Sequence, residues 1–309
     1  MHHTAVSWLV ASSVVVSAAI VCLPLARAQD LEPRAYSASP VGTSFLQIAY
    51  IRSSGAITFD PTIPITNVHA AYGAPAIGIS HTFGLFRRQS LFSAAFPYVW
   101  GNVSGDVGNE SGKVYRSGLA DIRFRYSINL HGSPALSPQE FAKEHRNTWI
   151  IGTSLTVQAP SGQYGGTKLV NIGTNRWSLK PELGFSYPVR RFYLDLYAGA
   201  WFFTDNTNYY PGGLTRSQQP LTTLQAHVSY NVRRGLWAAF DSTWYGGGAV
   251  SSAGAPYTDR ESNSRLGGTV SLPLPAGQSI KVAYSTGVYG TIGADFNTVS
   301  ISWQKVWLH

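Results

Sequence analysis

The sequence predicts an all-β protein: a closed antiparallel transmembrane β-barrel of about 12 strands, with a short helix at one end. Three observations support this prediction. Apolar and polar residues alternate along many segments, and the connections between those segments are short and long in turn. No stretch after residue 28 reaches the ~20 consecutive apolar residues of a membrane helix. Since only helices and closed rings of strands can span a bilayer, a spanning chain of this kind must use strands.

The composition agrees with a barrel. Of the 309 residues, 44% are hydrophobic and only 12% are charged, and the mean hydropathy is -0.04. A soluble domain usually has about 25% charged residues, and a helical membrane protein is far more apolar than this chain. In a transmembrane barrel, lipid-facing apolar residues alternate with polar lumen-facing ones, so the average hydropathy falls near zero.

The first 28 residues have the pattern of a signal peptide. An apolar stretch over residues 8–25 precedes Ala26-Arg27-Ala28, a small-x-small cleavage pattern. We therefore predict a signal peptide over 1–28, a periplasmic segment over 29–41 and the barrel over 42–309, in the bacterial outer membrane. An uncleaved membrane anchor is the alternative, and the short span argues against it. The only cysteine, Cys22, lies in the predicted signal peptide, so the mature chain would contain no disulfide.

The predicted strands follow the alternation. It is clearest in residues 119–130, where Ile122 and Phe124 share one face and Arg123 and Arg125 the other. An even number of strands returns both termini to the same side of the membrane. The predicted strands cover residues 42–52, 68–83, 90–103, 117–130, 147–160, 174–187, 191–204, 219–232, 235–247, 262–273, 278–289 and 295–307.

The connections assign the two ends of the barrel. Short ones lie at 84–89, 189–191, 233–235 and 273–278, and longer ones rich in Gly, Ser and Asn lie at 53–67, 104–116, 161–173, 205–218 and 246–261. Outer-membrane barrels have short periplasmic turns and longer outer loops. The connection at 132–146 differs, because Ser137, Pro138 and Glu140 form the start of a capped helix. We predict a short periplasmic helix there.

Polar residues with inward parity are the candidate functional residues. They would line a pore in which charged side chains set the selectivity, or they would form a charge-paired network that fills the barrel. A ring of about 12 strands lies between filled eight-stranded barrels and open porins, so both alternatives stay open. Tyr193 and Trp201, also predicted to point inward, could stack on an aromatic solute. The predicted pore-lining residues are Asp121, Arg123, Arg125, Lys180, Glu182, Asp195, Tyr197, His227, Asp241 and Arg265.

Motifs for catalysis and for metal binding are missing from the sequence. There is no HExxH, no GxSxG and no phosphate-binding loop, and the eight His residues are dispersed. We predict no catalytic residue, no metal and no cofactor. A lipid-modifying barrel enzyme is an alternative with poor candidates, His81 or His131 with Ser133. Removing residues 1–28 leaves a net charge of +7, but its scatter and the predicted export argue against nucleic acid as a partner.

Six segments carry a resemblance to a known family: "DLEPRAYSASPVG" (30–42), "SGLADIRFRYSINLHGSPAL" (117–136), "LVNIGTNRWSLKPELGFS" (169–186), "FFTDNTNYYPGG" (202–213), "SRLGGTVSLPL" (264–274) and "VAYSTGVYGTIGADF" (282–296). Over nearly all of its mature length the chain resembles the family named for the MetA pathway of phenol degradation. The resemblance implies an outer-membrane barrel that transports hydrophobic compounds. We expect passive uptake or efflux of small hydrophobic or aromatic solutes. The expected partners are outer-membrane lipid, the solute and, during insertion, the barrel-assembly machinery. A structural barrel with an occluded lumen is the alternative.

Overall fold

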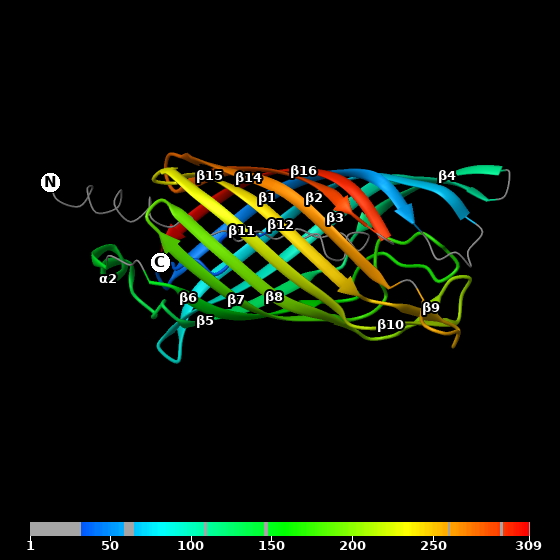
Figure 1. Ribbon diagram of the computed structural model, residues 1–309, viewed down its shortest axis with the longest axis horizontal. Helices are drawn as coiled ribbons and strands as arrows, with labels where there is room; N and C mark the ends of the chain where they lie inside the picture. The colour runs from blue at the N-terminus through cyan, green and yellow to red at the C-terminus, as the bar shows by residue number, and fades with distance from the viewer. Residues whose placement is uncertain are drawn as a thin grey trace.

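The chain folds into a barrel of tilted antiparallel strands (Figure 1). The structure is a computed structural model and describes residues 32–58, 65–107, 110–144, 148–258, 260–290 and 293–308. The predicted signal peptide, residues 1–28, lies outside the described residues.

The main sheet closes on itself. Its order is β2-β1-β16-β15-β14-β12-β11-β8-β7-β6-β5-β3, and the additional pairing of β2 with β3 completes a ring of 12 strands. The first and last strands form the seam, which runs from the pair Thr43 and Leu308 to the pair Thr58 and Gly293. Since every strand of the ring has a neighbour on both sides, the wall has no free edge to satisfy, as a lipid environment requires.

The 12 strands correspond in order to the 12 that the alternation predicts. They are β1 (Thr43–Thr58), β2 (Ile65–Leu85), β3 (Arg88–Val107), β5 (Arg123–His131), β6 (Ile150–Gln158), β7 (Ser178–Val189), β8 (Phe192–Phe203), β11 (Leu221–Arg233), β12 (Leu236–Gly247), β14 (Glu261–Leu274), β15 (Gln278–Tyr289) and β16 (Gly293–Leu308).

The fourth predicted strand, 117–130, is interrupted. It is divided between β4 (Glu110–Leu119) and β5, with a break at residues 120–122. β3 pairs with β5 through its first half and with β4 through its second half. Residues 104–116, predicted as a loop, therefore belong mostly to a hairpin that extends beyond the ring (Figure 1).

The two ends of the barrel differ. At one end, which we call the turn end, lie the start of β1, the end of β16 and α2 (Pro138–Lys143) (Figure 1). The capped helix is confirmed: the Ser137 hydroxyl accepts from the Glu140 N–H, and the Glu140 carboxylate accepts from the Ser137 N–H. Among the described residues, no helix is long and apolar enough to cross a membrane.

The opposite end, which we call the loop end, carries a second small sheet. β9 (Asn206–Tyr209), β10 (Leu214–Gln218) and β13 (Val250–Ser252) pair in the order β13-β10-β9. The sequence analysis expects these residues in long loops. Short strands rich in Asn, Ser and Thr lack the apolar alternation on which the prediction relies.

The wall has an apolar outer face and a polar inner face. Leu183 and Leu196 are 60% and 58% exposed on the outside, whereas Ser186 and Asp241 are fully buried on the inside. In β7 the alternation of buried and exposed residues runs for ten residues without interruption. This arrangement suits hydrocarbon outside and polar groups inside.

Candidate functional site in the barrel lumen

All ten residues predicted to line the pore lie on the inner face of the wall. Nine are buried, and Arg125 is slightly more accessible, with 12% of its side chain exposed. Their strand neighbours Leu179, Leu183 and Leu196 are exposed on the outer face. Nine of these residues are turned inward from strands and Asp121 from the break between β4 and β5, while their role in lining a solute path stays a prediction.

Residues 32–41 enter the barrel and lie within the wall. The sequence analysis predicts residues 29–41 as a periplasmic segment, but the described part of it occupies the lumen. The N–H of Arg34 donates to the Asp195 carboxylate (3.0 Å), and its guanidinium donates to Asn231 (2.7 Å). The same guanidinium lies 4.5 Å from the ring centroid of Trp237. Buried acceptors of the wall thus satisfy donors of a segment that has no regular secondary structure.

The ring of Tyr36 lies across two glycines of the wall. Gly152 on β6 and Gly184 on β7 are register partners, so they sit side by side. A Cβ atom at Gly184 would lie 2.1 Å from the Tyr36 ring, and one at Gly152 would lie 2.2 Å from it. Any larger residue at either position would displace the ring. Glycine within a strand commonly marks such a close approach.

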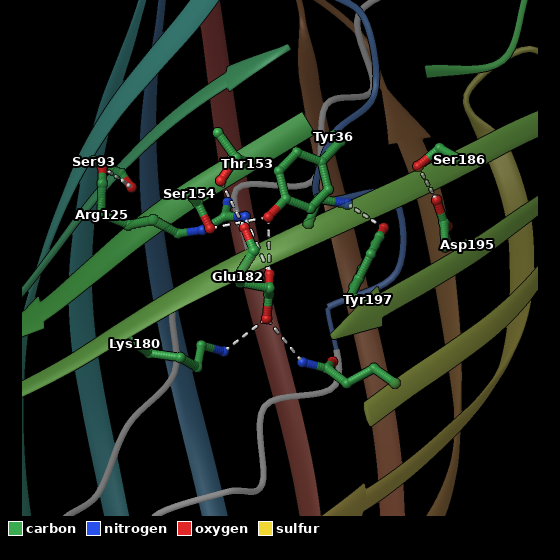
Figure 2. Close-up of polar contacts among 12 residues, drawn as sticks. Tyr36, Ser93, Arg125, Thr153, Ser154, Lys180, Glu182, Ser186, Asp195 and Tyr197 are labelled. Carbon is green, nitrogen blue, oxygen red and sulfur yellow. Dashed lines mark hydrogen bonds and ion pairs between the residues drawn. The ribbon is translucent and has the colours of Figure 1, made fainter. Parts of the chain in front are cut away.

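The Tyr36 hydroxyl is held by two polar side chains (Figure 2). It donates to Glu182 Oε1 at 3.0 Å, and Ser154 Oγ lies 2.9 Å from it. Because the hydroxyl has only one proton, the Ser154 hydroxyl is the donor to the Tyr36 oxygen. The Arg125 guanidinium lies 5.1 Å from the ring centroid, within cation–π range. We call the five wall residues around this ring the Tyr36 cradle: Arg125, Gly152, Ser154, Glu182 and Gly184.

The main chain of the segment is held by the two neighbours of the glycine pair. Asn129 on β5 is the register partner of Gly152, and its side chain donates to the Tyr36 carbonyl oxygen (3.1 Å). Tyr197 on β8 is the partner of Gly184, and its hydroxyl accepts from the Ala35 N–H (3.0 Å). One row of residues across four strands therefore fixes both the backbone and the ring.

Charged residues of the inner wall form compact pairs. Glu182 accepts from Lys180 at 3.0 Å and lies 3.7 Å from Arg125. His227 Nδ1 lies 2.7 Å from Asp241 Oδ1, and both side chains are fully buried. The other Asp241 oxygen accepts from Thr269 (2.7 Å). These contacts are the charge-paired network that the sequence analysis keeps as an alternative to a pore lining.

Asp121 has a separate role, because it holds the connection between β6 and β7. Its carboxylate accepts from Gln158 (3.0 Å), from the Gly162 N–H (2.9 Å) and from the N–H and hydroxyl of Thr174 (3.0 and 2.6 Å). In the same connection, Ile172 packs into an apolar cluster on the inner face. Residues 159–177 are therefore folded back onto the wall, where Asp121 is their anchor.

The loop half of the inner face carries two apolar clusters beside buried charged side chains. One cluster on β1, β2, β3 and β16 includes Ile51, Tyr72 and Phe296, and another contains Trp201 and Tyr245. Above the indole of Trp201 lie two cations: Arg123 at 5.3 Å and Lys180 at 5.5 Å from the ring centroid.

Several residues of the lumen are not among the predicted ones, and four of them illustrate why. Trp237 is buried on the inner face, and its parity with Asp241 was the available signal. Gly152 and Gly184 stand among inward polar positions, where a glycine indicates that another group approaches the backbone. Tyr36 belongs to a segment without periodicity, so no local pattern placed it.

A closed ring with a lipid-facing apolar surface, a polar interior and a segment seated in the lumen defines an outer-membrane β-barrel of the channel type. A family model described as "Putative MetA-pathway of phenol degradation" matches residues 61–303. The chain belongs to this family.

Solved structures agree in fold. The COG4313 outer membrane channel from Pseudomonas putida F1 matches with a TM-score of 0.75 and 18% identity, covering 90% of this chain and 100% of that one. The beta domain of the Bordetella autotransporter BrkA matches with a TM-score of 0.52 and 13% identity, covering 86% and 100%. A search of curated proteins gave no match. These two structures are membrane barrels, which agrees with the prediction that the chain is not an enzyme. Within the described residues, no group of three or more His, Cys, Asp or Glu is placed to hold a metal ion.

Proposed function

We propose that this barrel is a passive outer-membrane channel for small hydrophobic or aromatic solutes, and that residues 32–41 close its lumen. The turn end then faces the periplasm and the loop end faces the outside, as short turns and long loops do in barrels of this class. Nothing in the proposal requires an energy source, because solutes would move down their concentration gradient.

The observation that carries the proposal is the apolar part of the inner face. A channel for hydrophilic solutes needs only polar side chains along its path. Here the inward side chains of the loop half include Ile51, Tyr72, Phe296, Trp201 and Tyr245, which are buried in two apolar clusters inside the barrel. Apolar and aromatic surfaces of this kind favour apolar solutes over water and sugars. Membership in the family supports the same solute class.

The test compares intact cells with and without the protein in their outer membrane. We expect faster initial uptake of radiolabelled naphthalene by cells that have the barrel. Proteoliposomes should show little swelling with sucrose, which is too large and too polar for the path. Equal naphthalene uptake with and without the barrel would contradict the proposal.

A structural barrel with an occluded lumen is the second candidate. The specific observation in its favour is the buried charge network, in which Glu182 contacts Lys180 and Asp241 contacts both His227 and Thr269. This candidate predicts no conductance in planar bilayers for the wild type and also none after displacement of residues 32–41. The proposed channel conducts after that displacement.

A further inference from the structure

The Tyr36 cradle has the features of a ligand site. We call the backbone at the paired glycines Gly152 and Gly184 the floor of the cradle. Neither glycine places a side chain on this floor, so a flat ring can lie directly against β6 and β7. The polar groups of the cradle converge on one point, the hydroxyl of a six-membered aromatic ring. The two glycines beneath the ring, the two partners of its hydroxyl and the Arg125 guanidinium all belong to wall strands, so the wall supplies the groups that hold the ring.

The occupant of this cradle is itself a phenol, since the tyrosine side chain is a phenol with one substituent. We propose that the Tyr36 cradle is a binding site for free phenols, and that Tyr36 is an intramolecular stand-in for the solute. That this site takes part in transport rests on the proposed function; that it binds phenols does not. When the segment leaves, a solute phenol occupies the same floor and makes the same two hydrogen bonds.

The groups of the cradle select a hydroxylated aromatic ring over a plain one. Glu182 requires a donor at the hydroxyl position, and Ser154 requires an acceptor. A phenol satisfies both, whereas benzene leaves a buried carboxylate without one of its donors. A site built to hydrogen-bond a hydroxyl rejects the analogue that lacks it, because its own polar groups lose their partner.

The neutral phenol is the form that fits. Burial raises the pKa of the Tyr36 hydroxyl above the ordinary value for tyrosine, despite the opposing effect of Arg125, and the negative charge of Glu182 raises it further. The proton therefore stays on the oxygen at physiological pH. A phenolate would place its charge 3.0 Å from the Glu182 oxygen that now accepts the proton.

A purely mechanical anchor would not need this construction. The segment is already tied to the wall through Arg34 and through the main-chain contacts of Asn129 and Tyr197. Glycine inside a strand weakens the strand, so two paired glycines in the wall are a cost to stability. This loss of strand stability is explained if the two glycines are needed to let a flat aromatic ring bind against the wall.

The experiment removes the stand-in and offers phenol itself. Tyr36→Ala leaves a space of one phenol ring, and thermal unfolding of the purified barrel in detergent is followed with added phenol, benzene or cyclohexanol. We expect phenol to raise the unfolding temperature of Tyr36→Ala and not that of the wild type. The fitted affinity for phenol should exceed that for benzene by about 10-fold, the effect of a hydrogen bond to a charged group.

Two glycine substitutions supply the matched control. In the Tyr36→Ala background, Gly184→Ala places a methyl group on the floor, whereas Gly268→Ala on β14 places one where its nearest contact is an ordinary 3.6 Å. The Gly268→Ala variant should keep the response to phenol, and the Gly184→Ala variant should lose it. Partition of phenol into detergent is the same for both, so it cancels from the comparison.

A second variant keeps the test decisive if the Gly184→Ala barrel does not fold, as judged by heat-modifiable migration on gels. Ser154→Ala in the Tyr36→Ala background should lower the preference for phenol over benzene. The inference is overturned if phenol and benzene bind Tyr36→Ala equally, or if Gly184→Ala and Ser154→Ala both leave phenol binding unchanged.

Binding and transport separate the two proposals. If Tyr36→Ala binds phenol and naphthalene uptake does not depend on the barrel, the proposed function fails and the cradle stands. If uptake depends on the barrel and the cradle variants bind phenol no differently, the inference fails and the proposed function stands.

Discussion

The two halves of the lumen are built differently. In the half toward the turn end, charged and hydroxyl side chains are joined in short contacts, such as that of His227 with Asp241, and they hold residues 32–41. In the half toward the loop end, two apolar clusters lie on the inner face, and Arg123 and Lys180 lie against an indole. Under the proposed function, the first half closes the barrel and the second provides the apolar part of the solute path.

The difference shows that inward parity alone does not define a pore. Asp241 and Arg123 occupy equivalent inward positions, yet the carboxylate is fully buried in a pair and the guanidinium lies against an aromatic ring. Substitutions in the turn half should therefore affect closure and stability, and those in the loop half should affect selectivity.

The largest effect is expected from Gly184→Ala in the otherwise wild-type chain. The new methyl group would lie 2.1 Å from the Tyr36 ring, so the ring must leave the floor and the segment loses its deepest contact. Single-channel conductance in planar bilayers should rise several-fold. Gly268→Ala, a glycine substitution in the same kind of wall, should conduct like the wild type. Unchanged conductance in Gly184→Ala would show that Tyr36 does not close the path.

A smaller but clear effect should follow Asp241→Ala. The substitution removes the partner of a buried His227 and of the Thr269 hydroxyl. Breaking a buried pair typically costs about 3 kcal/mol. Urea unfolding of the barrel in lipid vesicles should show a loss of this size, while Asp241→Asn, which keeps a hydrogen-bonding oxygen, should lose less. If both variants unfold like the wild type, the pair does not stabilise the turn half.

The double variant Arg123→Ala with Arg125→Ala sharpens the contrast by removing two cations from the inner face. We expect the reversal potential in a salt gradient to shift toward cations and solute uptake to change, because charged rings set selectivity in narrow pores. The stability should change less than in Asp241→Ala. If conductance, selectivity and uptake all equal those of the wild type, these arginines do not line the path.

The mildest effect lies outside the lumen, at α2. Hydrogen bonds from Ser137 lower the pKa of Glu140 below its ordinary value. A lowered pKa means that the capping contact stabilises the helix above the ordinary glutamate pKa and is lost as pH falls through the lowered one. Hydrogen-exchange protection of the Phe141 amide should drop over that acidic range. In Ser137→Ala the protection should be weaker at neutral pH and should vary less across the same range.

Much of the wall could be predicted from the sequence because strand geometry is local. Alternation over β7 places Lys180 and Glu182 inside and Leu183 outside, and no long-range knowledge is needed. The capping box of α2 is equally local, with Ser137 and Glu140 three residues apart. The same reasoning does not predict the break between β4 and β5. There β3 changes its pairing partner from β5 to β4, although the sequence pattern of residues 117–130 suggests one continuous strand.

The centre of the candidate site could not be predicted, because it joins residues far apart in the chain. Tyr36 meets Ser154 and Glu182 across 118 and 146 residues, and its segment has no periodic pattern. The inward glycines Gly152 and Gly184 were the sequence signal that something approaches the wall. Only the structure shows that the approaching group is the ring of Tyr36.

The position of Tyr36, six residues before the turn at Gly42, has a further consequence. Gly42 has a positive φ of 79° and begins the connection to β1, so the phenol side chain is tethered close to its own cradle. A short flexible tether gives an effective local concentration on the order of millimolar, and hydrogen bonds that fix Ser39 and Val41 to the barrel raise it further. A free phenol therefore competes with the side chain of Tyr36 for the cradle, and it displaces that side chain only when its own concentration reaches a similar range. The length of chain between Tyr36 and Gly42 thus sets the phenol concentration at which the Tyr36 ring is displaced. Inserting residues between Tyr36 and Gly42 should lower that concentration.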